Sequence, residues 1–182
     1  MAMGFCYFNN VAVVAEYIRR SKGVKRLAIV DFDVHHGNGT QHLFEERGDV
    51  LYVSIHQHPF YPGTGTAAER GRLAGVGATL NVPLPAGSGD QVYREVFEKI
   101  VLPSVRQFGP EALLISAGFD AWEGDPVGGM RVTEEAFREW GTWLGQVADE
   151  LCAGRVLVTL EGGYDLAALA SLVVAHCQGL EG

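Results

Sequence analysis

Short apolar runs rich in valine, isoleucine and leucine recur along the chain, at residues 27–30, 50–55, 112–115 and 155–160. Each run is nearly continuous in apolar character instead of alternating with polar positions. Such runs are typical of strands that are buried on both faces of a parallel sheet. The pattern therefore predicts four strands, which would make a thin sheet.

Longer segments with helical spacing of apolar residues separate these runs. We expect Asn10 to cap a helix that reaches about Arg20, and Asp90 to cap one that Pro103 kinks or ends. A third helix is expected from Thr133 to about residue 151, and a fourth from Asp165 toward residue 177. Strands and helices in alternation predict a single α/β domain over residues 1–182, with a mainly parallel sheet and helices on both faces.

Composition and charge narrow the functional classes. The net charge of −8 argues against direct nucleic-acid binding and mildly favours cationic substrates such as lysine side chains or polyamines. Three widely spaced cysteines predict no disulfide framework and a reducing compartment. The first residues lack the basic start of a signal peptide, and Glu16 interrupts their apolar run, so we expect a cytoplasmic protein without a membrane span.

Ionisable groups and glycines follow every predicted strand. The strand ends continue into DFDVHHGNG, SIH, SAGFD and EGGYD, beginning at Asp31, Ser54, Ser116 and Glu161. Ligands of open α/β sheets bind at the carboxyl ends of the strands. This convergence predicts a functional site at that edge of the sheet.

The spacing of Asp31, Asp33 and His35 puts their side chains on one side of an extended segment. Asp33 and His35 can then reach a common cation, with Asp31 alongside and Asp120 as a third ligand from a neighbouring strand end. Two carboxylates and one imidazole leave a fourth position open, as in catalytic zinc sites. Zinc is the expected metal, with ferrous iron as the alternative.

Five motifs, in order, make the sequence similar to the histone deacetylase family, including bacterial acetylpolyamine amidohydrolases and acetoin-utilisation proteins. They are GFCYFNN from residue 4, DFDVHHGNGT from 31, YPGTG from 61, SAGFD with GDP from 116 to 126, and EGGY from 161. The last two resemble the class II branch. The resemblance covers almost the whole chain and implies an arginase/deacetylase-like fold and hydrolysis of acetyl-lysine or acetylpolyamine.

The resemblance also implies roles for individual residues. Asp33, His35 and Asp120 would bind zinc, and Tyr164 would hydrogen-bond the substrate carbonyl as it becomes an oxyanion. Phe5 and Tyr61 would line the acyl-lysine channel, with the Gly4 carbonyl near the substrate amide. A structural potassium ion is implied at a second site, with these residues: Asp31, Ser54 and the backbone of His35.

One expected feature of the family is missing from this sequence. The general base in the family belongs to a tandem histidine pair shortly before the Gly-Phe-Cys motif, and here only Met1, Ala2 and Met3 precede Gly4. We therefore expect the C-terminal portion of a longer catalytic domain or a naturally truncated form. The first strands of the family sheet would then be missing, and an unpaired sheet edge would favour self-association.

Three other functions compete with a deacetylase. A non-catalytic module that binds acylated ligands or partner proteins would keep the channel without turnover. A nucleotide-binding domain is suggested by GTGTAA from residue 63, which does not follow a strand directly. An arginase-like hydrolase with two metals would need more carboxylate and histidine ligands than this sequence supplies.

Overall fold

A single five-stranded sheet organises the computed structural model, which describes residues 2–182. All neighbouring strands are parallel, in the order β3-β2-β1-β4-β5. The strands are β1 (Leu27–Asp31), β2 (Val50–Gln57), β3 (Thr79–Leu84), β4 (Ala112–Ala117) and β5 (Val156–Leu160). Because the strands are parallel, their carboxyl ends meet at one edge of the sheet.

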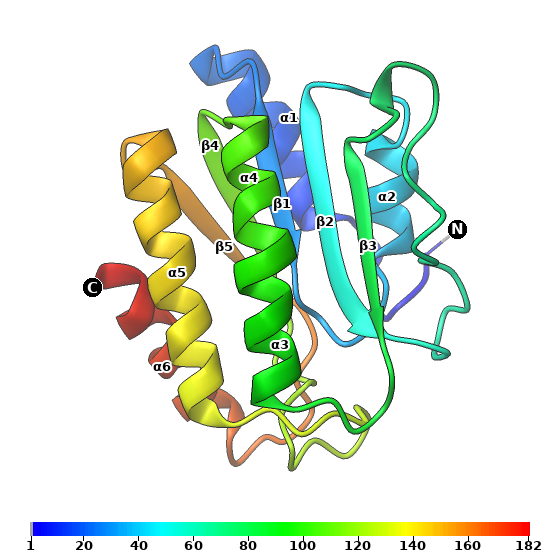
Figure 1. The fold of residues 1–182 in the computed structure, drawn as a ribbon, viewed down its shortest axis with the longest axis vertical. Coiled ribbons are helices and arrows are strands. Elements are labelled where there is room, and N and C mark those ends of the chain that lie inside the picture. Colours follow the sequence, from blue (N-terminus) through cyan, green and yellow to red (C-terminus); the bar gives the residue numbers. More distant parts are fainter. Residues whose placement is uncertain (1) are drawn as a thin grey trace.

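Helices cover both faces of this sheet (Figure 1). Behind it in this view lie α1 (Asn10–Lys22) and α2 (Asn38–Phe44). In front lie α3 (Asp90–Val96), a π-helical turn (Phe97–Val101), α4 (Leu102–Phe108) and α5 (Glu134–Cys152). The last helix, α6 (Leu169–Glu181), packs against α5, and a short 3₁₀ turn (Leu73–Gly75) precedes β3.

Alternate strand residues feed two separate hydrophobic clusters, one on each face. Leu27 and Ile29 of β1 pack toward α1, whereas Ala28 and Val30 pack toward α5. At the centre of the larger cluster, the fully buried Trp140 contacts four aromatic rings, those of Phe32, Tyr93, Phe97 and Phe137. The predicted α/β class, the parallel sheet and the two helical layers are confirmed.

The strand β5 forms one edge of the sheet among residues 2–182. Every residue of β1, β2 and β4 is buried, but all five residues of β5 are partly or largely exposed. Leu157 and Leu160 are 40% and 54% exposed. Exposed edges of this kind can pair with another chain. Self-association at such an edge stays a prediction.

The sequence pattern missed the strand β3. Its residues alternate between apolar and polar, and Asn81 and Pro83 interrupt the run. Proline cannot donate to a ladder of hydrogen bonds, but an edge strand tolerates it because one side of the strand has no partner. The sheet therefore has five strands instead of the four that were predicted.

Three predicted helix caps are wrong in detail. The side chain of Asn9, not Asn10, caps α1 by accepting from the backbone N–H of Ala12 at 2.9 Å. Asp90 lies inside the first turn of α3 and accepts hydrogen bonds from Thr133. Asp165 caps the turn before α6, accepting from two backbone N–H groups of residues 167 and 168.

Pro103 neither ends nor sharply breaks the helical segment that contains it. The preceding π-helical turn lets the backbone N–H of Leu102 donate to the carbonyl of Phe97, five residues back. Pro103 then falls in the first turn of α4, where its missing N–H is not needed. A local change of helical pitch therefore accommodates the proline.

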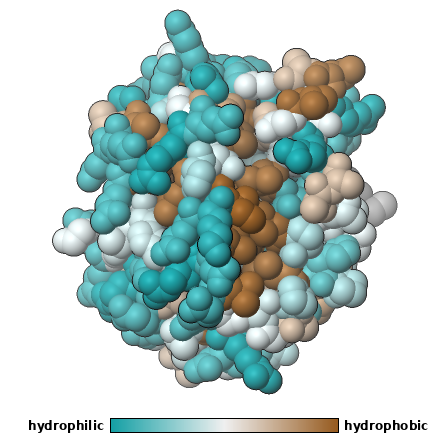
Figure 2. All heavy atoms as spheres, in the orientation of Figure 1, coloured by the Kyte–Doolittle hydropathy of each residue, from teal (hydrophilic) through white to brown (hydrophobic). Residues whose placement is uncertain are grey.

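The surface of the face seen in Figure 1 is mainly hydrophilic, with an apolar area in its middle beside α4 (Figure 2). The cysteines Cys6, Cys152 and Cys177 are free, as the sequence analysis expected. Within residues 2–182, no helix combines the length and the apolar character that crossing a membrane requires.

Candidate metal centre

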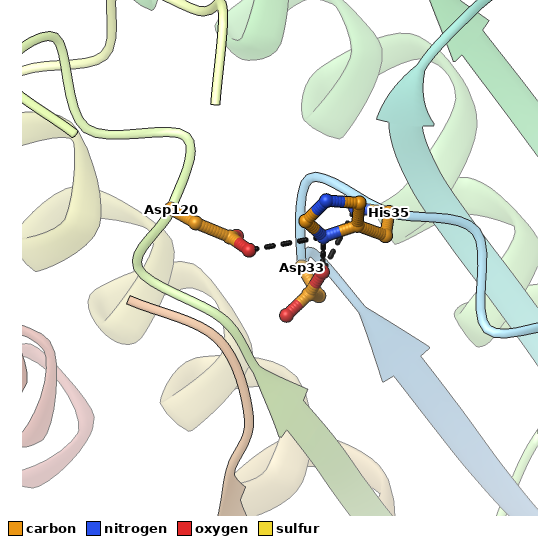
Figure 3. A group of neighbouring side chains, drawn as sticks. All are labelled: Asp33, His35 and Asp120. Atoms are coloured by element: carbon orange, nitrogen blue, oxygen red, sulfur yellow. Dashed lines mark hydrogen bonds and ion pairs between the residues drawn. The ribbon is translucent and has the colours of Figure 1, made fainter. Parts of the chain in front are cut away.

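Three potential metal ligands meet at the carboxyl ends of two adjacent strands (Figure 3). Asp33 and His35 lie in the loop after β1, and Asp120 lies in the loop after β4, which pairs directly with β1. One ligand atom from each residue lies within 4.8 Å of the others. The Asp120 side chain is fully buried, and those of Asp33 and His35 are 14% and 20% exposed.

Backbone hydrogen bonds orient both carboxylates. Asp33 Oδ1 accepts from the backbone N–H of His35 and Oδ2 accepts from that of Gly162, each at 2.8 Å. Asp120 Oδ1 accepts from the backbone N–H of Val34, also at 2.8 Å. Asp120 Oδ2 is buried without a hydrogen-bond donor and lies 3.1 Å from Nδ1 of His35. A buried carboxylate oxygen left without a donor fits a position that a cation completes.

The electrostatics of the cluster also favour a cation. Burial raises the pKa of Asp120, and the neighbouring charge of Asp33 raises it further. Burial opposes protonation of His35, but the adjacent carboxylates of Asp120 and Asp33 outweigh burial and raise the pKa of the imidazole. The two neighbouring carboxylates therefore favour a positive charge beside them, which a metal ion can supply. Two carboxylates and one imidazole suit zinc or ferrous iron, so the residues present fit the implied metal.

Glycines keep the space around the carboxylates open. A side chain at Gly162 would collide with both Asp120 and Asp33, and one at Gly118 would collide with Asp33. The EGGY and SAGFD motifs thus supply clearance as well as ligands.

We expect the Gly162→Ala variant to bind zinc about 10–100-fold more weakly, the range found when groups around a metal's ligands are disturbed. Alanine can adopt the Gly162 backbone conformation, so the effect should come from displaced carboxylates. Competition with a chromogenic chelator measures the affinity. Gly39→Ala in α2, whose added methyl would meet only Asn9 at 3.7 Å, is the matched control. Equal affinities of the two variants would contradict the steric argument.

A cavity of about 490 Å³ opens onto the cluster and is lined by the predicted substrate residues Gly4, Phe5, Tyr61 and Tyr164. The Phe5 ring meets the Tyr164 ring edge-on, with centroids 6.3 Å apart, and the backbone N–H of Gly4 donates to the Tyr61 hydroxyl at 3.3 Å. Phe5 is 91% exposed and Tyr61 is 51% exposed. Both aromatics therefore form an open rim among the described residues instead of a closed channel.

The phenol of Tyr164 remains a hydrogen-bond donor at neutral pH. Burial and the nearby carboxylates of Asp120 and Asp33 raise its pKa to about 12. Its backbone N–H donates to Asp125 Oδ2 at 2.7 Å, and Asp125 Oδ1 also accepts from the backbone of residues 127 and 128. Asp125, which the sequence analysis named only within the GDP motif, thereby fixes the turn that carries Tyr164.

Two residues of the predicted potassium site lie side by side on adjacent strands. Asp31 and Ser54 are opposite each other in the β1–β2 register, and Asp31 is buried and accepts from the Tyr52 hydroxyl at 2.9 Å. Burial raises the pKa of Asp31. The Ser54 hydroxyl, however, lies 2.9 Å from Nδ1 of His56 and shares a hydrogen bond with it. Binding of a monovalent cation here stays a prediction.

Glu161 is a cavity residue to which the sequence assigned no role. Its carboxylate is half-buried at the cavity wall and accepts from the Ser116 hydroxyl at 2.9 Å. Burial is the main cause that raises its pKa to about 7, and the charge of Asp33 adds to it. The available signals were its place directly after a predicted strand and at the start of the EGGY motif.

The raised pKa of Glu161 gives a pH-dependent prediction. Because the folded protein favours the neutral acid, Glu161 costs no stability below its ordinary pKa of 4.5, and the cost grows as the pH rises through about 7. The metal-free Glu161→Gln variant should match the wild type at pH 4.5. At pH 8 it should be more stable by about 1–2 kcal/mol, allowing for partial exposure.

Urea unfolding in the presence of a chelator measures this difference, with the exposed Glu98→Gln as the control. A stability change for Glu161→Gln that is the same at both pH values would show that ionisation of Glu161 is not responsible.

Comparison with known proteins finds relatives that match almost the whole chain. The family model described as "Histone deacetylase domain" matches residues 1–180. The chain is 45% identical over 180 residues to "Histone deacetylase 14, chloroplastic" of Arabidopsis thaliana, covering 99% of this chain and 43% of that protein. It is 40% identical over 182 residues to "Histone deacetylase-like amidohydrolase" of Pseudomonas aeruginosa, covering 100% of this chain and 48% of that protein.

Two solved structures agree with this placement. The HDA15 HD domain superposes with a TM-score of 0.91 at 45% identity, covering 98% of this chain and 51% of that one. Acetylpolyamine aminohydrolase from Burkholderia pseudomallei gives a TM-score of 0.91 at 39% identity, covering 100% and 52%. The chain thus spans about half the length of these two proteins and two solved structures.

Proposed function

This chain belongs to the histone deacetylase family, and from that premise we propose that it forms the metal-binding portion of a zinc-dependent deacetylase. The substrate is the acetyl amide of acetyl-lysine or of an acetylated polyamine, and the products are acetate and the free amine. The observation that carries the proposal is the buried Asp120 oxygen without a donor, facing His35 and Asp33 at the base of the cavity. The net charge of −8 suits a cationic product.

Asp33, His35 and Asp120 would hold the metal, with ferrous iron as the alternative to zinc. When bound, such an ion acts as a Lewis acid toward the acetyl carbonyl and activates water for attack. The backbone donors of Val34, Gly162 and residue 35 hold both carboxylates in place before the metal arrives. Little side-chain entropy then remains to be lost on binding.

Tyr164 would donate a hydrogen bond to the carbonyl oxygen as negative charge develops there. Its phenol keeps its proton at neutral pH, and its backbone is fixed by Asp125. A donor that is already in place stabilises the developing charge without reorganisation in the transition state. Phe5 and Tyr61 at the cavity rim would contact the aliphatic stem of the substrate.

The general base is proposed to come from outside residues 1–182. The adjacent histidines of this chain are both engaged: His35 contacts the two aspartates, and His36 contacts Thr64 and Gln41. Loss of a general base typically lowers a rate by about 10²–10⁴. We expect the 182-residue chain to hydrolyse acetyl-lysine at a correspondingly reduced rate.

Acetate release from an acetyl-lysine peptide, measured with zinc and with an added chelator, tests this function. Slow, chelator-sensitive release would support the deacetylase. The engaged histidines also favour a second candidate, a module that binds acylated ligands without turnover. That candidate predicts binding of a hydroxamate to the zinc-loaded chain with no acetate released. A zinc-loaded chain that neither binds a hydroxamate nor releases acetate would contradict both.

A further inference from the structure

Two aromatic rings from the loop after β2 lie against the candidate metal ligand His35. The ring of Phe60 stacks on the imidazole, with centroids 5.1 Å apart and 20° between the planes. The ring of Tyr61 meets the same imidazole edge-on at 6.1 Å. These two rings form a wall, here called the Phe60–Tyr61 wall, on one side of the imidazole. The position of the loop therefore controls the position of the wall.

Apolar packing cannot fix most of this loop. Residues 63, 64, 66, 67 and 68 are exposed, and the sequence there consists of glycine, threonine and alanine. Gly63 and Gly65 have φ values of 84° and 87°, in the left-handed region that glycine adopts readily. Glycine also makes the unfolded chain more flexible, so this segment loses much conformational freedom when it folds. Ordering such a segment has an entropic cost that other contacts must offset.

Glu69 supplies those contacts. Its Oε1 accepts from the backbone N–H groups of Gly65 at 3.0 Å and Thr66 at 2.9 Å, and from the Thr66 hydroxyl at 3.2 Å. Its Oε2 accepts from Gln41 Nε2 of α2 at 2.6 Å. Partial burial opposes ionisation of Glu69, but these hydrogen bonds outweigh it and lower its pKa. One carboxylate thus joins the loop to α2.

The hydrogen bond to Glu69 also determines which groups donate and which accept along a chain of contacts that ends at His36, the residue next to the metal ligand His35. Because Gln41 donates its Nε2 to Glu69, its Oε1 accepts from Asn81 at 2.7 Å and from His36 Nε2 at 2.9 Å. His36 then carries its proton on Nε2, and its Nδ1 accepts from the Thr64 hydroxyl at 2.8 Å. Gln41, Asn81 and His36 are all buried, so a reversed donor would find no water to replace its partner.

We propose that Glu69 is a positioning residue that holds the Phe60–Tyr61 wall against His35 and thereby sets how the site accepts the stem of an acyl ligand. Glu69 does not line the cavity and acts only through the loop. The proposal rests on the proposed metal-centre function, because the wall matters for binding only when a ligand reaches the metal.

The test compares two hydroxamates on the zinc-loaded chain. Octanohydroxamic acid has a chelating group and a long apolar stem, and acetohydroxamic acid has the same chelating group without the stem. In Glu69→Gln, the amino group of the new amide faces the amino group of Gln41, and two donors cannot form a hydrogen bond. The loop therefore loses its link to α2. We expect octanohydroxamic acid to bind about 10-fold more weakly, equivalent to lost contact with about two methylene groups. Binding of acetohydroxamic acid and of zinc should stay unchanged.

An exchange of the two partners provides the rescue. In the double variant Glu69→Gln/Gln41→Glu, the amide at position 69 donates to a carboxylate at position 41, which still accepts from His36 and Asn81. Every donor again has an acceptor, so the affinity for octanohydroxamic acid should return. Thr64→Val, which removes only the contact with His36, should weaken octanohydroxamic acid binding less than Glu69→Gln does. The exposed Glu98→Gln is the control and should bind both compounds as the wild type does.

Three results would overturn the proposal: undiminished octanohydroxamic acid binding by Glu69→Gln, equal weakening of both hydroxamates, or no recovery in the double variant. A zinc-loaded wild type that binds neither compound would instead overturn the proposed function, and the role of Glu69 with it. The two failures are therefore distinguishable from the wild-type measurement alone.

Discussion

We expect the Asp120→Ala variant to lose stoichiometric zinc binding, whereas the wild-type chain retains one zinc ion per molecule. Asp120 is fully buried and offers the one carboxylate oxygen of the cluster that lacks a hydrogen-bond donor. Its removal leaves one carboxylate and one imidazole, too few ligands for a stable zinc site. The loss of affinity should exceed the 10–100-fold effect of changes in groups that only support ligands. Metal analysis after dialysis and calorimetric titration measure both quantities.

Asp149→Ala provides the matched control for this experiment, because Asp149 is an exposed aspartate on α5 away from the cluster. It should bind zinc as the wild type does. Retention of zinc by Asp120→Ala at unchanged affinity would place the metal elsewhere. Failure of the wild-type chain to bind zinc would mean that residues 1–182 do not assemble the site by themselves.

The second large effect is expected for Tyr164→Phe. Removal of one positioned donor to a developing oxyanion typically lowers kcat by about 10²–10³. Zinc affinity should not change, because the phenol is not among the three grouped ligands. Hydrolysis of an acetyl-lysine peptide should be measured in this chain, and in a longer chain that includes it if the rate of the shorter one is too low. The direction of the effect should be the same in both.

Tyr17→Phe is the matched control, since it removes a phenol hydroxyl from the exposed side of α1. A Tyr164→Phe variant with undiminished kcat would exclude Tyr164 as the donor. A variant that lost zinc as well would indicate a structural role for the hydroxyl, and the measured rate would then not report on the transition state.

Much of the fold followed from the hydrophobic pattern. Continuous apolar runs predicted four buried strands, and each is present with small shifts at its ends, although the residues of β5 are partly or largely exposed instead of buried. The fifth, β3, lacked this signal because only one of its sides must pair in the sheet, so that Asn81 and Pro83 are tolerated. The predicted kink or end at Pro103 was wrong because a π-helical turn precedes the proline and places it in the first turn of α4. No propensity rule predicts such a turn.

The sequence by itself determined the class of fold and nominated Asp33, His35 and Asp120, because a parallel sheet brings its strand ends together whatever the details of packing. Only the tertiary structure decided which side chains surround these three. The stacking of Phe60 on His35, the support of Tyr164 by Asp125 and the contact of Glu69 with Gln41 join residues 25 to 39 positions apart. Such pairs depend on strand register and loop conformation, which local sequence patterns do not encode.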